Sequence, residues 1–273
     1  MSLELQTDEV VSDSRSSKHQ PSLELRAALE AATLAASVIR AAYGQNPQVT
    51  IKADQSPVTS ADLAAEKAIR ALLSDRFPTH AFYGEETGRS LGSESAPLWI
   101  VDPIDGTRCF IAGYPMFSTQ IALAHQGHMQ IGVSSAPVYG ELAYAQRGGG
   151  AYLNGAAIHV SSVADLNQAA ISVGNIRRLA ASPRWAQYGR LVERVAYSRG
   201  YGDFLHYHLL AAGKLDAVIE DGIQIYDIAA LVAIVEAAGG CCTQIDGAPI
   251  TESSTSVIAT NGLLHPEIVN ALN

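Results

Sequence analysis

Apolar residues recur at helical spacing near the start of the chain. Steps of four and three relate the apolar or small residues Leu25, Leu29, Ala32, Ala36 and Ile39. This period predicts an amphipathic helix over about residues 22–42, ended by Gly44 and Pro47. A second helix is predicted after Thr59 and Ser60, whose side chains suit an N-cap, and it should stop before Pro78.

Short apolar runs predict strands in the middle of the chain. Leu98-Trp99-Ile100-Val101 is a continuous run that finishes on Asp102, which places this carboxylate at a strand end. Further runs over residues 121–144 are separated by turn signals, and an Asn154-Gly155 pair gives a hairpin signal. This stretch therefore predicts an antiparallel meander.

Strands and helices alternate from residue 170 onward. We expect strands at residues 171–173 and 215–220, and helices at residues 204–212 and 228–238 that are closed by glycines. Such a mixture predicts an α/β or mixed α+β fold, without fixing the order of its layers. The first 20 residues are polar and read as a loose N-terminal tail, so residues 21–273 should form a single unit of two lobes.

Composition and charge narrow the classes of function. With 48% hydrophobic and 16% charged residues the chain should fold, and no run reaches the roughly 18 apolar residues of a membrane span. A net charge of −9 without a basic run argues against binding to nucleic acid. A phosphate ligand would therefore need a bound cation or focused backbone N–H groups.

The three cysteines are too few and too poorly spaced for a disulfide framework or a thiolate zinc site. They are Cys109 and the adjacent pair Cys241 and Cys242. A reducing cytoplasm fits this usage best.

The densest chemical feature is the stretch from Trp99 to Thr107, together with Gly84-Glu85-Glu86 and Tyr226-Asp227. Pro103 fixes the backbone between Asp102 and Asp105, so the turn can aim both carboxylates to one side. Ionised carboxylates cannot crowd together unless some are protonated or a cation neutralises them. A ligand set of oxygens alone favours magnesium, manganese or calcium over zinc.

Anion binding is expected immediately after this carboxylate cluster. Gly106 permits close approach, and the N–H groups that follow Thr107 at the start of a helix would bind a phosphate oxygen. Taken alone, each Asp-Pro or Asp-Gly pair is a turn, and Asp227 is an N-cap for a helix that begins at Ile228. The complete string favours the chemical interpretation.

These motifs resemble the inositol monophosphatase superfamily of magnesium-dependent, lithium-sensitive phosphatases. The resemblance covers about residues 22–272, with Gly84-Glu85-Glu86, Asp102 to Thr107 and Tyr226 to Ala230 in the expected order. It implies a layered αβαβα sandwich, a homodimer, and hydrolysis of the phosphate monoester of a small metabolite with two or three Mg²⁺ ions, or Mn²⁺ in their place.

The resemblance also implies roles for individual residues. It makes metal ligands of Glu85, Asp102, Asp105, Asp227 and the carbonyl of Ile104. It implies that Gly106 and Thr107 contact phosphate together with Asp105 and Asp227, that Thr107 and Glu85 orient the attacking water, and that Asp62 engages the threonine. Lys52 matches a lysine near a more weakly held metal.

Substrate branches of the family differ around Arg199-Gly200-Tyr201-Gly202-Asp203. Inositol phosphatases tend to carry a small or hydroxyl residue after the corresponding glycine, whereas Tyr-Gly-Asp resembles the histidinol-phosphate phosphatases. Asp203 would pair with a substrate ammonium or imidazole, although it also suits an N-cap for the helix from Phe204. Arg108 is likewise familiar from the histidinol branch, and Glu220 matches a position that contacts a polar group of the substrate or is an exposed strand end.

The leading hypothesis is therefore histidinol-phosphate hydrolysis in histidine biosynthesis. An inositol-1-monophosphatase or a broad sugar-phosphate phosphatase is the alternative of the same class, and a non-catalytic regulatory or binding protein is the alternative of another class. We interpret Cys109 as a small buried residue rather than a nucleophile, and His206 and His208 as core or rim residues rather than metal ligands.

Overall fold

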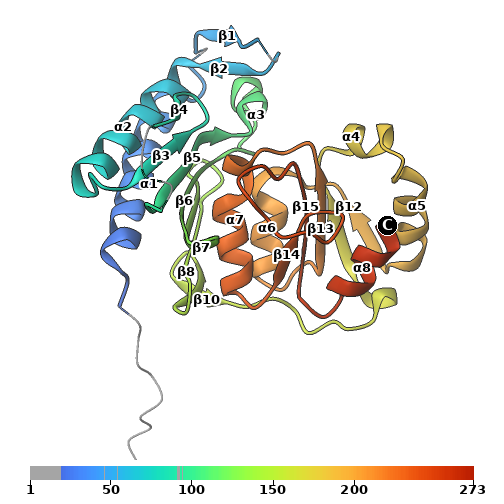
Figure 1. Cartoon of the computed structure of the whole chain (residues 1–273). Coiled ribbons are helices and arrows are strands. Elements are labelled where there is room, and N and C mark those ends of the chain that lie inside the picture. The colour runs from blue at the N-terminus through green and yellow to red at the C-terminus, as the bar shows by residue number, and fades with distance from the viewer. Residues whose placement is uncertain (1–19, 46, 54, 91–92, 94) are drawn as a thin grey trace, which may run out of the picture.

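The computed structural model describes residues 20–45, 47–53, 55–90, 93 and 95–273. Figure 1 shows helices and sheets in alternating layers, with α1 and α2 on one outer face and α4, α5 and α8 on the other. Two sheets lie between these faces, and α6 and α7 separate them. The layered αβαβα sandwich implied by the resemblance is confirmed. The predicted tail lies outside the described residues except for Gln20.

The first layer consists of the two predicted helices, α1 (Leu23–Ala42) and α2 (Ser60–Arg76). Ser22 begins α1 by accepting a hydrogen bond from the Leu25 N–H at 3.1 Å. Thr59 begins α2 in a capping box, because its hydroxyl accepts from the Ala61 N–H while the Asp62 carboxylate accepts from the Thr59 N–H. Both predictions are confirmed.

The larger sheet has eight strands in the order β10-β9-β8-β7-β6-β5-β3-β4 within the described residues. The strands are β3 (Ala81–Gly84), β4 (Gly88–Arg89), β5 (Leu98–Asp105), β6 (Ser118–His125), β7 (His128–Ala136), β8 (Glu141–Gln146), β9 (Gly150–Leu153) and β10 (Ala156–Ile158). Strands β5 to β10 pair antiparallel with their neighbours, as predicted for the meander, and β3 is parallel to β5. A separate hairpin of β1 (Val49–Ile51), which is exposed, with β2 (Pro57–Thr59) was not predicted.

Strand β5 continues beyond the predicted end at Asp102. Asp102 still pairs with Gln120 of β6, but the register then shifts, and pairing resumes at Asp105 opposite Ser118. Pro103 and Ile104 thus occupy a bulge, which bends the strand and changes the direction of the side chains beyond it. The placement of Asp102 at the strand end is therefore wrong, since the bulge separates the two carboxylates without ending the strand.

In the described part of the chain the smaller sheet has five strands, in the order β12-β11-β13-β15-β14. They are β11 (Ala170–Val173), β12 (Tyr197–Arg199), β13 (Ala217–Asp221), β14 (Cys241–Thr243) and β15 (Ser256–Thr260). The first three are parallel, and β15 lies antiparallel between β13 and β14. The outer face of this smaller sheet is covered by α4 (Ile176–Ala181), α5 (Trp185–Arg194) and α8 (His265–Leu272).

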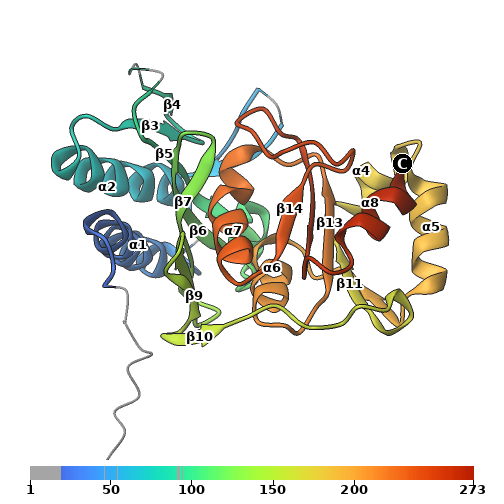
Figure 2. The same ribbon diagram turned by 60° about the horizontal axis from the view of Figure 1, so that its bottom comes forward.

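The middle layer carries the site-bearing helices α6 (Asp203–Ala211) and α7 (Ile225–Ala237). In Figure 2, α7 lies between the two sheets, and its apolar residues are buried almost all round. Helix α7 begins three residues before the predicted start, so Asp227 is the third helical residue and not the N-cap. Across the described residues we find no helix with the length and apolar character needed to cross a bilayer.

Candidate active site

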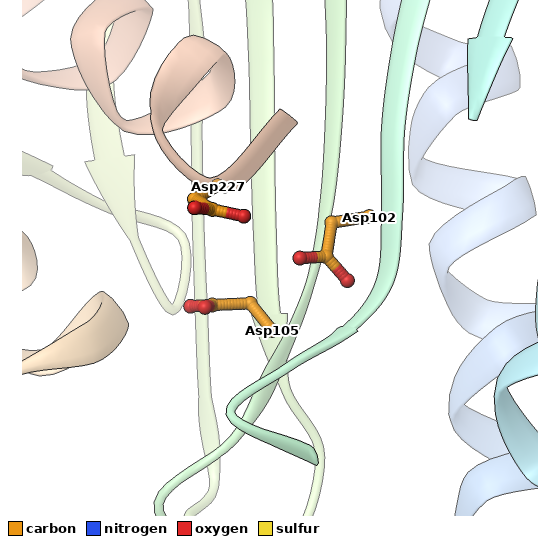
Figure 3. Close-up of side chains that lie close together, drawn as sticks. All are labelled: Asp102, Asp105 and Asp227. Atoms are coloured by element: carbon orange, nitrogen blue, oxygen red, sulfur yellow. The ribbon is translucent and has the colours of Figure 1, made fainter. Parts of the chain in front are cut away.

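Three carboxylates meet beside the bulge of β5. Asp102 and Asp105 come from β5, and Asp227 comes from the first turn of α7 in the middle layer. Each offers one oxygen, and these oxygens lie within 4.8 Å of one another. Figure 3 shows the three side chains facing a common point. The larger sheet and α7 thus bring together residues that are more than 120 positions apart.

Burial and mutual repulsion make this cluster unfavourable when all its members are charged. Burial raises the pKa of Asp102 well above its ordinary value, and Glu85, Asp105 and Asp227 raise it further. Burial also raises the pKa of Asp105, with further contributions from Asp203 and Asp227. A divalent cation would remove this repulsion.

Asp227 has a second function as a helix cap. Its carboxylate accepts a hydrogen bond from the Gln224 N–H at 2.7 Å, which fixes the side chain at the helix start. Burial nevertheless raises the pKa of Asp227 to about 7. Three crowded oxygen donors, fixed by a bulge and a cap, fit a hard divalent cation such as magnesium.

Glu85 and Glu86 follow β3 and form ion pairs with Lys52. The Lys52 Nζ lies 2.9 Å from Glu85 Oε1 and 2.8 Å from Glu86 Oε1. Although burial disfavours the ammonium, the hydrogen bonds to Glu86 and Glu85 raise the pKa of Lys52. Glu85 is thus held by Lys52 in this structure and also acts electrostatically on Asp102.

A buried carboxylate, Glu66 on α2, fixes the turn that carries these glutamates. Glu66 is fully buried and accepts hydrogen bonds from the N–H groups of Glu86 and Thr87 at 2.8 and 2.9 Å. A Cβ on Gly84 would lie 2.4 Å from the Glu66 carboxylate, so only glycine fits there. Glu66 was not predicted as a site residue, although its spacing from Asp62, one turn earlier, could have indicated a shared helix face.

Thr107 connects α2 with the bulge of β5. Its hydroxyl lies 3.3 Å from Asp62 Oδ1 and 3.0 Å from the Ile104 carbonyl, both of which can accept its proton. The other oxygen of Asp62 accepts from the Thr59 hydroxyl at 2.5 Å. Burial raises the pKa of Asp62. The structure therefore brings Asp62 and Thr107 together.

The residues around the start of α3 (Thr107–Ala112) differ in their exposure. Gly106 has a φ of 89°, and a Cβ there would lie 2.7 Å from the Met116 carbonyl, so the turn requires glycine. Arg108 is exposed on α3. Cys109 is partly exposed rather than buried, and burial together with the charges of Asp203 and Asp105 raises the pKa of its thiol. A protonated thiol is a poor nucleophile.

A cavity of about 190 Å³ extends from the carboxylate cluster to α6 and β13. Four carboxylate residues line it, namely Asp105, Asp203, Glu220 and Asp227. Asp203 is the first residue of α6, and Gly202 occupies the N-cap position. The N-cap interpretation of Asp203 is therefore wrong. Burial and the neighbouring Glu220 raise the pKa of Asp203 to about 6.

Glu220 is buried at the end of β13 instead of being an exposed strand end. It is 8% exposed and accepts a hydrogen bond from the Tyr207 hydroxyl at 2.9 Å. Tyr207, which also lines the cavity, was missed as a site residue. It stands one helical turn after Asp203, so the i, i+4 spacing was the available signal. His206 and His208 are fully buried or nearly so, as expected of core residues.

Comparisons with known proteins agree with this architecture. A sequence model of the inositol monophosphatase family matches residues 22–273. The structure is similar to the extragenic suppressor protein suhB of Bartonella henselae, with a TM-score of 0.84 and 33% identity over 92% of this chain and 99% of that chain.

Curated relatives carry two kinds of name. A histidinol-phosphatase of Mycobacterium tuberculosis is 38% identical over 92% of this chain and 98% of its own length. An inositol-1-monophosphatase of Mesorhizobium japonicum is 34% identical over 84% of this chain and 87% of its own length.

Proposed function

The chain belongs to the inositol monophosphatase family, and from that premise we propose that it hydrolyses histidinol phosphate to histidinol and phosphate with magnesium. The coarser activity, a phosphoric monoester hydrolase, follows from the family and from the acidic cluster at its site. The observation that carries the finer proposal is the second acidic end of the cavity, where Asp203 and Glu220 face the space beside the cluster.

The metal end would hold the phosphate and the attacking water. Asp102, Asp105 and Asp227 would hold the ions, together with Glu85 and the Ile104 carbonyl. When bound, two or three Mg²⁺ ions, or Mn²⁺, lower the pKa of water and neutralise charge on the phosphoryl group. Gly106 and Thr107 would contact the phosphate oxygens beside Asp105 and Asp227.

Thr107 and Glu85 would orient the water for in-line attack. The Thr107 hydroxyl can donate to Asp62 at 3.3 Å as well as to the Ile104 carbonyl at 3.0 Å. When it donates to Asp62, its oxygen is left as an acceptor toward the water. Lys52 forms an ion pair with Glu85, whose charge acts on Asp102 of the cluster. The buried Asp62 carboxylate thus acts through Thr107.

The acidic end suits a substrate that carries positive charge. Histidinol phosphate has an ammonium and an imidazole in addition to its phosphate, and a carboxylate in a partly desolvated pocket favours such groups. Asp203 would bind this cationic end, and Glu220 would bind a second polar group. Arg108, which is exposed on α3, is the third side chain that would contact the substrate. The M. tuberculosis relative named histidinol-phosphatase supports this choice.

An inositol-1-monophosphatase or a broad sugar-phosphate phosphatase is the competing proposal. The relative of that name from M. japonicum is nearly as similar, and Glu220 could equally accept hydrogen bonds from hydroxyl groups. A non-catalytic regulatory or binding protein would need none of the three clustered carboxylates that this chain has.

Phosphate release from a substrate panel tests the proposal. Histidinol phosphate, inositol 1-phosphate and fructose 1,6-bisphosphate would be assayed with magnesium and with chelator. We expect the highest kcat/KM for histidinol phosphate, and no release in chelator. A preference for inositol 1-phosphate would reject histidinol phosphate as the substrate. No phosphate release from any of the esters would reject the proposal that the protein is a phosphatase.

Three further proposals concern the whole protein. We propose that residues 21–273 act as a single catalytic unit of two lobes and that the chain forms a homodimer, as the family resemblance implies. We also propose that it works in the cytoplasm, because the three cysteines are free. Light scattering of the purified protein tests the dimer.

A further inference from the structure

His206 lies fully buried on α6 with an unsatisfied nitrogen. Its Nε2 has no hydrogen-bond partner among the described residues, although Glu220 Oε2 lies 3.3 Å from it. A buried imidazole nitrogen without a hydrogen-bond partner destabilises the folded protein, so we asked what the nitrogen contributes at this position. Glu220 is the cavity carboxylate that the nitrogen faces.

The other nitrogen of His206 determines which ring atom carries the proton. Nδ1 lies 3.2 Å from the hydroxyl of the buried Ser172, and the same hydroxyl accepts from the Tyr201 N–H at 3.2 Å. If Nδ1 carried the proton of a neutral ring, the lone pair of Nε2 would face the carboxylate and repel it. The Ser172 hydroxyl therefore donates to Nδ1, and the Nε2–H points toward Glu220.

Glu220 is constrained on its remaining sides as well. The Tyr207 hydroxyl donates to Oε2 at 2.9 Å, and a Cβ on Gly174 would lie only 2.1 Å from Oε1. The carboxylate thus fills the space that the glycine leaves.

From these contacts we infer that His206 is a positioning residue for substrate selection. Ser172 fixes the His206 proton on Nε2, and this N–H holds the Glu220 carboxylate in place. The acidic end of the cavity can then bind a polar, cation-bearing substrate. This inference rests on the proposed function. His206 itself does not line the cavity and acts through Glu220.

Substrate selectivity distinguishes this role from simple packing. The His206→Leu variant would be compared with the wild type on histidinol phosphate and on p-nitrophenyl phosphate, an ester whose leaving group carries no hydroxyl and no cationic group. We expect kcat/KM for histidinol phosphate to fall about tenfold, mainly through KM, while the other ester changes by about twofold or less. His206→Gln, which keeps an N–H donor, should recover a large part of the loss.

His208→Leu is the matched control, because His208 lies on the same helix and is equally buried. Its ring faces the larger sheet instead, with Nδ1 2.8 Å from Glu141 Oε2 and Nε2 2.9 Å from the Ser134 hydroxyl. This variant should lose stability without a change in the ratio of the two kcat/KM values. An equal change in that ratio for both leucine variants would overturn the inference, as would no change in either.

Two provisions keep the test decisive. If His206→Leu does not fold, Ser172→Ala replaces it and should shift the same ratio in the same direction; an unchanged ratio there rejects the inference. If the wild type prefers inositol 1-phosphate, the proposed substrate is wrong, and the role of His206 is then decided with inositol 1-phosphate against p-nitrophenyl phosphate.

Discussion

Asp105 is the residue at which the two acidic ends of the cavity act on each other. After burial, the largest contributions to its raised pKa come from Asp203 at one end and Asp227 at the other. A cation beside Asp105 would relieve the repulsion from both sides. Substitutions of single residues should therefore distinguish the contribution of the metal end of the cavity to activity from that of the substrate end.

At the metal end, Asp105→Asn should abolish turnover while the fold remains intact. Removing one anionic ligand weakens cation binding and the stabilisation of the transferring phosphoryl group, so we expect kcat to fall by about 10³-fold or more. Phosphate release and thermal unfolding would be measured together. In chelator the variant should unfold no earlier than the wild type, because one buried like charge has been removed. Substantial turnover by this variant in excess chelator would contradict the metal mechanism.

At the substrate end, Asp203→Asn should change selectivity. Asp203 has a φ of 46°, a backbone conformation that asparagine also tolerates, so the exchange removes charge without straining the helix start. A charge-assisted contact is worth roughly 1.5–3 kcal/mol, so kcat/KM for histidinol phosphate should fall by about one to two decades. The value for inositol 1-phosphate, which has no cationic group, should be spared.

Asp75→Asn controls for the loss of one negative charge, since Asp75 is exposed on α2. It should leave both kcat/KM values unchanged. Equal losses for both substrates in Asp203→Asn would show that this residue supports the fold of the loop rather than substrate choice.

At the scale of elements, the turn after β3 depends on the absence of a side chain at Gly84. Gly84→Ala would push its methyl group into the Glu66 carboxylate, which holds the turn that carries Glu85. Overpacking of this kind lowers the free energy of unfolding by about 1–3 kcal/mol. The displacement of Glu85 should also lower kcat/KM. Urea unfolding at equilibrium and phosphate release would measure both effects.

Gly189→Ala is the matched exchange on α5, where nothing lies within 4 Å of an added Cβ. Alanine in a helix interior should stabilise the protein by about 0.5–1 kcal/mol, and activity should not change. Gly84→Ala as stable and active as the wild type would show that Glu66 does not hold the turn.

How far the sequence predicts each element depends on how local its signals are. Helix α1 was predicted from its apolar period, and α2 from the capping side chains of Thr59 and Ser60, because these signals lie within or beside each segment. The hairpin of β1 and β2 was missed because β1 is exposed along its length and has no alternating apolar pattern. The start of α7 was placed three residues late because Gln224 and Asp227 cap it in an arrangement that the apolar pattern does not reveal.

The site was predicted less evenly than the helices. The string from Asp102 to Thr107 identified the cluster, but the bulge that separates Asp102 from Asp105 depends on pairing with β6. The contacts of Glu220 with Tyr207 and His206 join β13 to α6, and no local pattern predicts them. The order of the five layers came from the family resemblance, because periodicity carries no information about which sheet a strand joins.

At the scale of the whole molecule, the acidic cavity makes stability depend on pH and on the cation. Helix α7 carries Asp227 between the two sheets, so repulsion at the cluster acts on an element that both sheets pack against. In the folded, metal-free protein the pKa of Asp227 is raised to about 7 and that of Asp203 to about 6. In an unfolded chain an aspartate has a pKa of about 3.9.

The sign of the pH dependence follows from these values. Asp203 and Asp227 release their protons at lower pH in the unfolded chain than in the folded protein. Their contribution to the free energy of unfolding is therefore complete below about pH 4, and it is lost as the pH rises through their pKa values in the folded protein. In chelator, the unfolding temperature should therefore fall by roughly 5–10 °C from about pH 5 to about pH 8, a loss of a few kcal/mol. Excess magnesium binds the folded state and should reverse most of that fall. Asp105→Asn, which removes one member of the cluster, should show a shallower fall in chelator and less recovery with magnesium. An unfolding temperature that rises with pH in chelator, or that magnesium leaves unchanged at the higher pH, would mean that the three carboxylates do not form a cation site.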